Sequence, residues 1–111
     1  MDLTLENGTQ GSWAVVRVGG ELDLHTSPQL REHVLALIGE PPVRIAIDLT
    51  DVGFMDSSSL GTLVTCLKRV RERDGQLVLV GVTGSPMKVF TLTGLDRVFD
   101  IVLSRDRLPA G

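Results

Sequence analysis

The chain has 111 residues, 42% of them hydrophobic, which is the size of one ordinary domain with a single core. Its formal net charge of −3, with no Tyr, one Trp and three Phe, argues against a basic, aromatic surface for nucleic acid. A lone cysteine excludes an internal disulfide, and no residue cluster suggests a metal or a cofactor.

The N-terminal segment, MDLTLENGTQGS, lacks the basic stretch and long apolar run of a signal peptide or membrane anchor. The longest apolar run, LVLVGV at 77–82, falls far short of the roughly 20 residues that cross a bilayer. We therefore expect a cytoplasmic protein with no membrane partner.

The chain begins with a predicted hairpin or meander. Residues 13–18 are typical of a strand that ends at Gly19-Gly20, and Leu3 and Leu5 belong to a first strand paired with it. Asn7-Gly8 is the dipeptide that favours a tight turn between them.

Thr26-Ser27-Pro28 predicts the start of the first helix, because either hydroxyl can cap it and proline is tolerated at the first helical position. Gly39 and Pro41-Pro42 end it. The apolar stripe expected between these signals consists of Leu30, Val34, Leu37 and Ile38.

Residues 44–49 predict a buried strand, followed by a short turn and a second helix that begins at three consecutive serines. Cys66 lies on the apolar part of this helix, which favours a small buried residue over a nucleophile. The basic stretch late in the helix is typical of a solvated helix end.

The run at 77–82 predicts a parallel strand, since predicted helices precede and follow it. Ser85-Pro86 to Gly94 predicts a short third helix, 98–103 an edge strand, and 104–111 a loosely held tail. The expected architecture is one α/β domain over 1–111, ordered from about 3 to 103. It has a mixed sheet of four to five strands with three to four helices, and we expect a monomer.

The serines follow Asp56 at a predicted helix start, where unpaired N–H groups and the helix dipole tolerate a negative group, including one attached to a serine. Each of these polar residues is equally suited to plain capping. Asp56 has two interpretations that are compatible: it caps the helix, or it orients the Ser57 hydroxyl.

Two motifs in order carry a resemblance: GELDLHTSPQLRE at 20–32, and FMDSSSLG directly after an IDL strand. Together they resemble the anti-sigma factor antagonist branch of the STAS domain family, over about Leu3 to Leu103. In that family the serine directly after the aspartate is phosphorylated, which here is Ser57. The resemblance thus implies a STAS fold. One departure from the motif is Ser59, which stands where the family usually has glycine.

The resemblance also implies a partner switch. The unphosphorylated protein would bind an anti-sigma factor that is a serine kinase, phosphorylation at Ser57 would end the binding, and a phosphatase would restore it. Asp23 belongs by resemblance to the partner-facing surface, although a solvated turn residue is an equal alternative. The expected partner-binding residues are Asp23, His25, Asp56, Ser57, Ser58, Ser59 and Leu60.

We expect no catalytic activity, because the chain has no G-x-S-x-G elbow that would join His25 and Ser57 in a hydrolase, and no phosphate-binding loop. His25 is most simply a loop residue. The alternative function within the family is a non-phosphorylated STAS subunit of a transport or sensory assembly.

Overall fold

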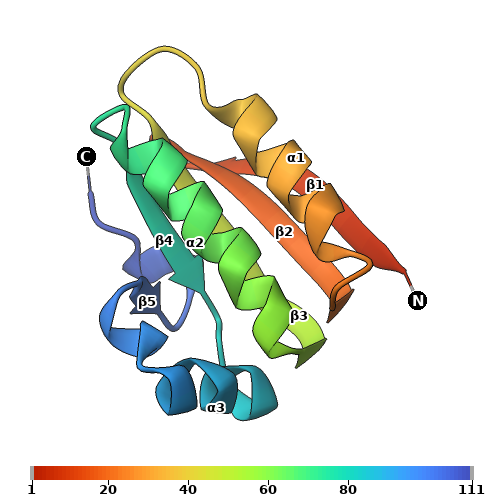
Figure 1. Cartoon of the computed structure of the whole chain (residues 1–111). Coiled ribbons are helices and arrows are strands. Elements are labelled where there is room, and N and C mark those ends of the chain that lie inside the picture. The colour runs from red at the N-terminus through yellow and green to blue at the C-terminus, as the bar shows by residue number, and fades with distance from the viewer. Residues whose placement is uncertain (1, 111) are drawn as a thin grey trace.

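The computed structural model describes residues 2–110 as a five-stranded sheet with helices (Figure 1). The strands lie in the order β1-β2-β3-β4-β5, with β1 antiparallel to β2 and the other neighbours parallel. The strands are β1 Leu3–Gln10, β2 Trp13–Leu22, β3 Arg44–Met55, β4 Gln76–Val80 and β5 Asp100–Val102. The helices are α1 Ser27–Leu37, α2 Ser57–Arg71 and α3 Gly84–Thr93, with short 3-10 turns at Leu95–Arg97 and Arg105–Arg107.

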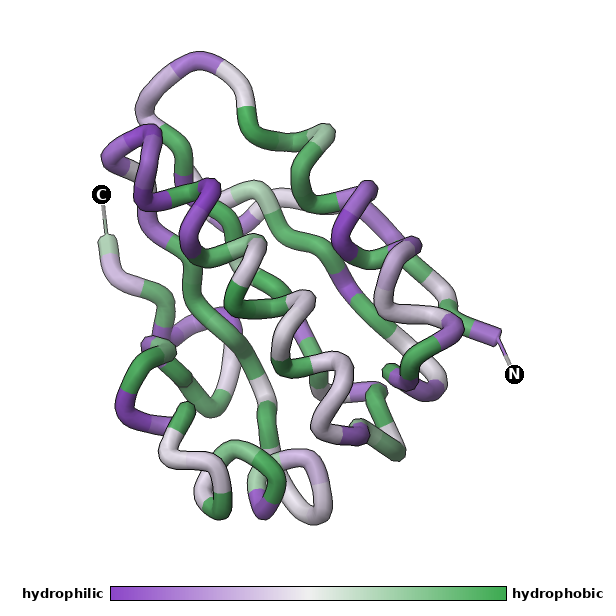
Figure 2. The backbone as a smooth tube through the Cα atoms, in the orientation of Figure 1, coloured by the Kyte–Doolittle hydropathy of each residue, from purple (hydrophilic) through white to green (hydrophobic). Residues whose placement is uncertain are grey.

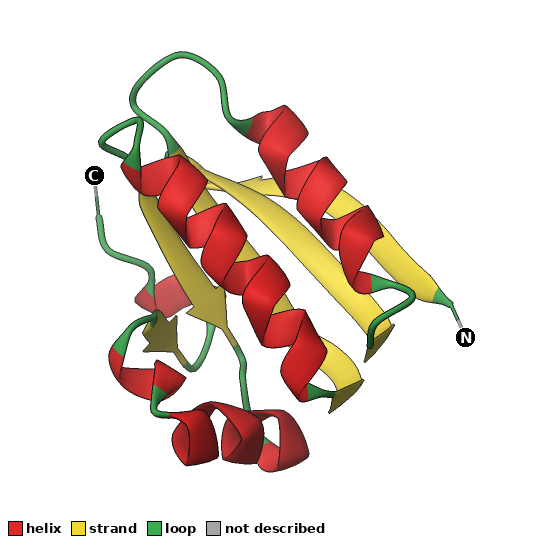
Figure 3. Ribbon diagram, in the orientation of Figure 1, coloured by secondary structure: helices red, strands yellow, loops and turns green. Residues whose placement is uncertain are grey.

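Helices α1 and α2 cover one face of the sheet, while α3 lies beyond the carboxyl end of β4 (Figure 3). The main core lies between this face and the helices, and its largest fully buried side chains include Phe90, Leu22, Leu30, Ile47 and Leu63. The α/β class, the mixed sheet and the three helices agree with the sequence-based prediction. The chain reverses into α1 and α2 just after β2 and β3, so both helices begin at the carboxyl edge of the sheet.

The first hairpin turns at a different place from the one expected. Strand β1 runs through Asn7-Gly8, and the reversal falls at Gly11, whose positive φ of 58° suits glycine. Strand β2 likewise continues through Gly19-Gly20 to Leu22. Register shifts beside β3 occur at these glycines, and a Cβ on Gly20 would lie 2.3 Å from the Asp2 carbonyl oxygen.

Strand β3 is longer than predicted, and the expected turn before the serines is wrong. Its 12 residues run to Met55, directly before Asp56. The end of β2 pairs with this extension, as Glu21 lies opposite Phe54 and Leu22 opposite Met55. Long-range strand pairing therefore keeps extended a segment whose polar and glycine residues resemble a turn.

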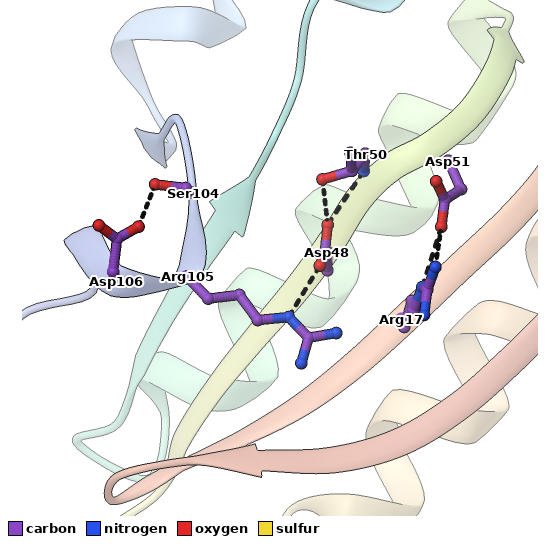
Figure 4. A network of polar contacts seen from close by, with 7 residues as sticks. All are labelled: Arg17, Asp48, Thr50, Asp51, Ser104, Arg105 and Asp106. Carbon is purple, nitrogen blue, oxygen red and sulfur yellow. Dashed lines mark hydrogen bonds and ion pairs between the residues drawn. The ribbon is translucent and has the colours of Figure 1, made fainter.

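The C-terminal segment lies against the sheet face that α1 and α2 leave open (Figure 4). Arg105 Nε donates to Asp48 Oδ2 at 2.9 Å, and Trp13 Nε1 donates to the Pro109 carbonyl at 2.9 Å. Leu108 packs against a small cluster that includes Trp13 and Val80. The loose tail expected from the sequence stays a prediction. The segment nevertheless makes these specific contacts, although few of its residues are apolar.

The Asp48 carboxylate makes the free energy of unfolding depend on pH in the acid range. Burial alone would raise the pKa of Asp48, but hydrogen bonds from Thr50 and Arg105 outweigh burial and lower the pKa below its ordinary value. This contribution to stability is complete above the unfolded pKa of about 3.9 and is lost as the pH falls through the lower, folded pKa.

We expect Asp48→Asn to flatten part of the decline in stability below about pH 4.5, measured as urea midpoints from neutral to acid pH. Asp100→Asn, at an exposed position on β5, serves as the control and should follow the wild type. Parallel wild-type and Asp48→Asn curves would contradict this account of Asp48.

Candidate functional site

The structure brings the two motif loops together at the carboxyl edge of the sheet, through the backbone carbonyl of Leu22. This oxygen accepts the Asp56 N–H at 3.2 Å and the Ser59 hydroxyl at 3.3 Å. Leu22 ends β2 and Asp56 follows β3, so the pairing of the two strands sets the contact. We call the surface formed by 23–25, 54 and 56–58 the candidate surface.

Asp56 caps α2, as one of the two interpretations of the sequence predicts. Its carboxylate accepts the Ser59 N–H at 3.2 Å and the Ser58 hydroxyl at 2.5 Å, and its extended backbone directs the chain into the helix. Neither bond involves Ser57. The carboxylate therefore stabilises the helix start while the adjacent hydroxyl stays free of it.

Ser57 is the first residue of α2, and its side chain is exposed. Within residues 2–110 its hydroxyl has no hydrogen-bond partner. The hydroxyl lies at the end of a 15-residue helix, where the partial positive charge of the dipole favours an anion. This environment can accept a covalently attached negative group without breaking an existing contact.

Ser59 and Leu60 lie beneath the candidate surface. Ser59 is fully buried, and its hydroxyl donates to the Asp56 carbonyl at 2.6 Å as well as to Leu22. Leu60 is 3% exposed and belongs to the core. The first turn of α2 directs both side chains inward, so in this conformation they lie away from the surface, and their part in partner binding stays a prediction.

Ser59, where the motif resemblance leads us to expect glycine, directs its side chain into the protein. The Ser59 hydroxyl links the start of α2 to the end of β2 and adds no atoms to the exposed part of the helix start. The Ser59 side chain lies away from the exposed Ser57 hydroxyl. The Ser59 hydroxyl anchors the helix start, while the hydroxyls of Ser57 and Ser58 stay at the exposed surface.

We expect Ser59→Ala to lower the free energy of unfolding by about 1 kcal/mol, because a buried hydrogen-bonding group is lost. Urea denaturation monitored by Trp13 fluorescence measures the change. Ser58→Ala, which removes an exposed hydroxyl from the same turn, should cost less than about 0.5 kcal/mol. Equal losses in the two variants would show that the buried hydroxyl has no special part in holding α2.

The Asp23 carboxylate stabilises the loop in which it lies. Its Oδ1 accepts the N–H groups of His25 at 2.8 Å and Thr26 at 2.9 Å. These bonds, that of Thr26 foremost, hold the pKa of Asp23 below its ordinary value. The structure thus supports the turn interpretation of Asp23 and leaves a direct partner contact as a prediction.

The cap expected from the hydroxyls at the start of α1 is absent, since neither Thr26 nor Ser27 makes a side-chain cap bond there. The Thr26 hydroxyl donates instead to the Glu21 carbonyl at 2.7 Å, and that of Ser27 to the Asp23 carbonyl at 2.7 Å. Both residues are buried and fix the Asp23 loop.

His25 is exposed, as expected for a loop residue. Two apolar side chains that the sequence did not single out are exposed on the same surface: Leu24 at 67% and Phe54 at 47%. The sequence did contain a pattern that indicates an exposed Leu24, because this apolar residue stands between Asp23 and His25 in a polar loop. Phe54 was missed because the end of β3 was taken for a turn.

The described part of the chain offers few groups for metal binding or nucleophilic chemistry. Residues 2–110 contain no group of three His, Cys, Asp or Glu placed to hold a metal. Burial raises the pKa of the Cys66 thiol to about 11, so the thiol stays protonated at neutral pH. The helices described are too short or too polar to cross a membrane.

Comparison with known proteins defines the class of protein. The STAS domain family model matches residues 4–108. An anti-sigma-B factor antagonist from Staphylococcus aureus is 37% identical over 95 residues, covering 86% of this chain and 88% of the relative. The chain therefore belongs to the STAS domain family, in agreement with the resemblance seen in its motifs.

Solved structures support the same assignment. An anti-sigma factor antagonist from Mycobacterium paratuberculosis superposes with a TM-score of 0.83 at 28% identity, covering 95% of this chain and 89% of that one. The phosphorylated form of the Bacillus cell fate determinant SpoIIAA superposes with a TM-score of 0.68 at 25% identity, covering 95% of each chain.

Proposed function

We propose that this protein is an anti-sigma factor antagonist that works by partner switching. Unphosphorylated, it binds an anti-sigma factor that is also a serine kinase, which frees a sigma factor for transcription. The observation that carries the proposal is the exposed, unbonded hydroxyl of Ser57 at the start of α2, beside the Asp23 loop. The names of the relatives, and the existence of SpoIIAA in a phosphorylated form, support it.

Binding would use the candidate surface. Leu24 and Phe54 supply exposed apolar area of the kind that carries binding energy at the centre of interfaces. Asp23 acts by holding the loop in shape, and Ser59 and Leu60 support the surface from beneath. Contacts from His25, Ser57 and Ser58 complete it.

Phosphorylation would end the binding. The kinase transfers the γ-phosphoryl group of ATP to the Ser57 oxygen, which loses its proton to a base of the kinase as ADP leaves. The phosphoserine carries about −1.5 to −2 charge at pH 7. Closing an interface over this group without a basic mate costs several kcal/mol, so the complex dissociates.

A phosphatase would remove the phosphate and restore binding. The protein takes part as substrate and binding partner, with no catalysis of its own and no cofactor. Such a switch operates in the cytoplasm, where sigma factors and ATP meet, without direct contact with nucleic acid or membrane. Monomeric protein suffices for it.

Capture of the partner tests the proposal. The chain, immobilised through an added tag, is incubated with extract of its own source, and bound proteins are identified by mass spectrometry. We expect an anti-sigma factor kinase on the wild type and much less of it on Ser57→Asp. Recovery of a membrane transport ATPase or a sensory assembly on both proteins would instead support a non-phosphorylated STAS subunit.

A further inference from the structure

Four cations, Lys68, Arg69, Arg71 and Arg73, form a basic surface at the carboxyl end of α2 and in the turn that follows it. Figure 2 colours the backbone there as mostly hydrophilic. All four side chains are exposed. Two acidic residues, Glu72 and Asp74, lie among or directly after the four cations, which leaves a local excess of positive charge. The contact of Glu72 with Arg69, at 3.9 Å between exposed groups, is weak. Lys68, Arg71 and Arg73 have no ion pair with any residue that the structure describes.

The fold does not require this concentration of charge. A helix end gains from one or two cations, yet Lys68 and Arg71 lie three residues apart on one helix, where like charges repel. The whole chain carries a net charge of −3, so the basic surface is a local exception. Uncompensated charge of this kind is available for an anionic partner.

Two residues of the basic surface, Lys68 and Arg71, lie on the same face of α2 as Ser57. Ser57 and Lys68 are 11 residues apart, which is a rotation of about 20° beyond three full turns and a rise of about 16 Å. Small side chains lie between them on this face: Gly61, with no neighbour within 4 Å of a Cβ built on it, and Thr65. A protein that contacts Ser57 can therefore extend along α2 to the cations.

The surface around the cations is hollowed. Thr65, Lys68 and Arg71 line a shallow depression together with Arg69 and Glu72. A second depression, between the ends of α1 and α2, shares Arg69 and Glu72 and adds Leu35, Ile38 and Arg73. The two adjoining depressions can seat an extended stretch of chain that has carboxylates for the cations and an apolar residue for Leu35 and Ile38.

We propose that the basic surface docks an acidic segment of a partner protein. The inference rests on the proposed function for the identity of that partner, which is the anti-sigma factor that also contacts Ser57. Nucleic acid and anionic membranes are less suited, because the negative charge of the rest of the chain opposes a large polyanion. The surface would speed association by electrostatic steering.

The test measures binding of a fluorescein-labelled decaglutamate peptide to the full chain by anisotropy. We expect binding at about 20 mM salt that is lost at about 0.5 M. The variant Lys68→Glu/Arg71→Glu/Arg73→Glu should bind at least about tenfold more weakly at low salt. The matched control, Lys88→Glu/Arg97→Glu/Arg107→Glu, makes the same change in net charge at exposed positions elsewhere and should stay within about twofold.

Equal loss in the two triple variants, no binding at low salt, or tighter binding of a DNA oligonucleotide or an anionic phosphatidylserine vesicle would each overturn the inference. Ser57→Asp should bind the peptide within about twofold of the wild type, because the two sites are about 16 Å apart. The peptide assay does not involve phosphorylation, so its failure leaves the proposed function standing. Failure of Ser57 to be phosphorylated leaves the peptide result standing.

Discussion

Ser57→Asp is expected to weaken binding of the anti-sigma factor by at least about 100-fold, the equivalent of about 3 kcal/mol. A carboxylate at this position places an unpaired charge in the interface when the partner covers the start of α2. Isothermal titration calorimetry with the captured, purified anti-sigma factor measures the change. This is the largest effect that we expect of any single exposed substitution.

The loss should come from the interface and not from the fold. The helix end favours an anion at Ser57 by about 0.3 to 1 kcal/mol, while the neighbouring Asp56 repels it. The free energy of unfolding should therefore change by less than about 1 kcal/mol. Ser85→Asp, at an exposed serine in the first turn of α3, is the matched control and should keep the wild-type affinity within about threefold. An affinity of Ser57→Asp equal to that of the wild type would remove the basis for a switch at this residue.

Phe90→Ala is expected to give the largest loss of stability, about 3 to 5 kcal/mol. Phe90 is fully buried and fixes α3 beyond the carboxyl end of β4, with its ring edge-to-face on Phe99 at 5.7 Å between centroids. A loss of this size is a large part of the roughly 5 to 15 kcal/mol by which a domain is stable. Urea denaturation followed by circular dichroism measures it.

Leu92→Ala, on the same helix, is the control. Its side chain is 88% exposed, so the change should be within about 0.5 kcal/mol. Phe90→Leu, which keeps most of the apolar volume, gives an intermediate loss and keeps the comparison measurable if Phe90→Ala does not fold. A cost below about 1 kcal/mol for Phe90→Ala would mean that α3 is held by other contacts.

Local signals in the sequence predicted most of the helices and strands. Pro28 and Pro86 each follow a serine at the start of a helix, and both helices begin within a residue of the expected place. Asp56 before a run of small polar residues predicted both the start of α2 and its cap. These features depend on neighbours within a few residues, so the sequence alone carries them.

Features set by distant contacts were missed. The extension of β3 to Met55 depends on pairing with the end of β2, about 30 residues earlier. The inward direction of Ser59 follows from the position of the Leu22 carbonyl, 37 residues away in sequence. The anchoring of the tail depends on Asp48 and Trp13, which lie 57 and 96 residues from their partners.

In the candidate site, too, the sequence predicted the features that depend on near neighbours and missed those that depend on distant contacts. The motif indicated Ser57 as the candidate residue. In the structure its hydroxyl is accessible because Asp56 bonds to Ser58 and Ser59 instead. The motif could not distinguish the exposed members of the serine run from the buried one, because that depends on which side of α2 faces β2. The exposed Leu24 and Phe54 likewise emerged only with the loops in place.

Peptide-mapped mass spectrometry shows whether Ser57 is the residue that a kinase phosphorylates. Wild type, Ser57→Ala and Ser58→Ala are each incubated with ATP and extract of the protein's own source, in which a kinase is shown to modify a known substrate. We expect one phosphate on the peptide containing Ser57 in the wild type and Ser58→Ala, and none in Ser57→Ala. Phosphate that persists in Ser57→Ala, or an unmodified wild type, would contradict the account.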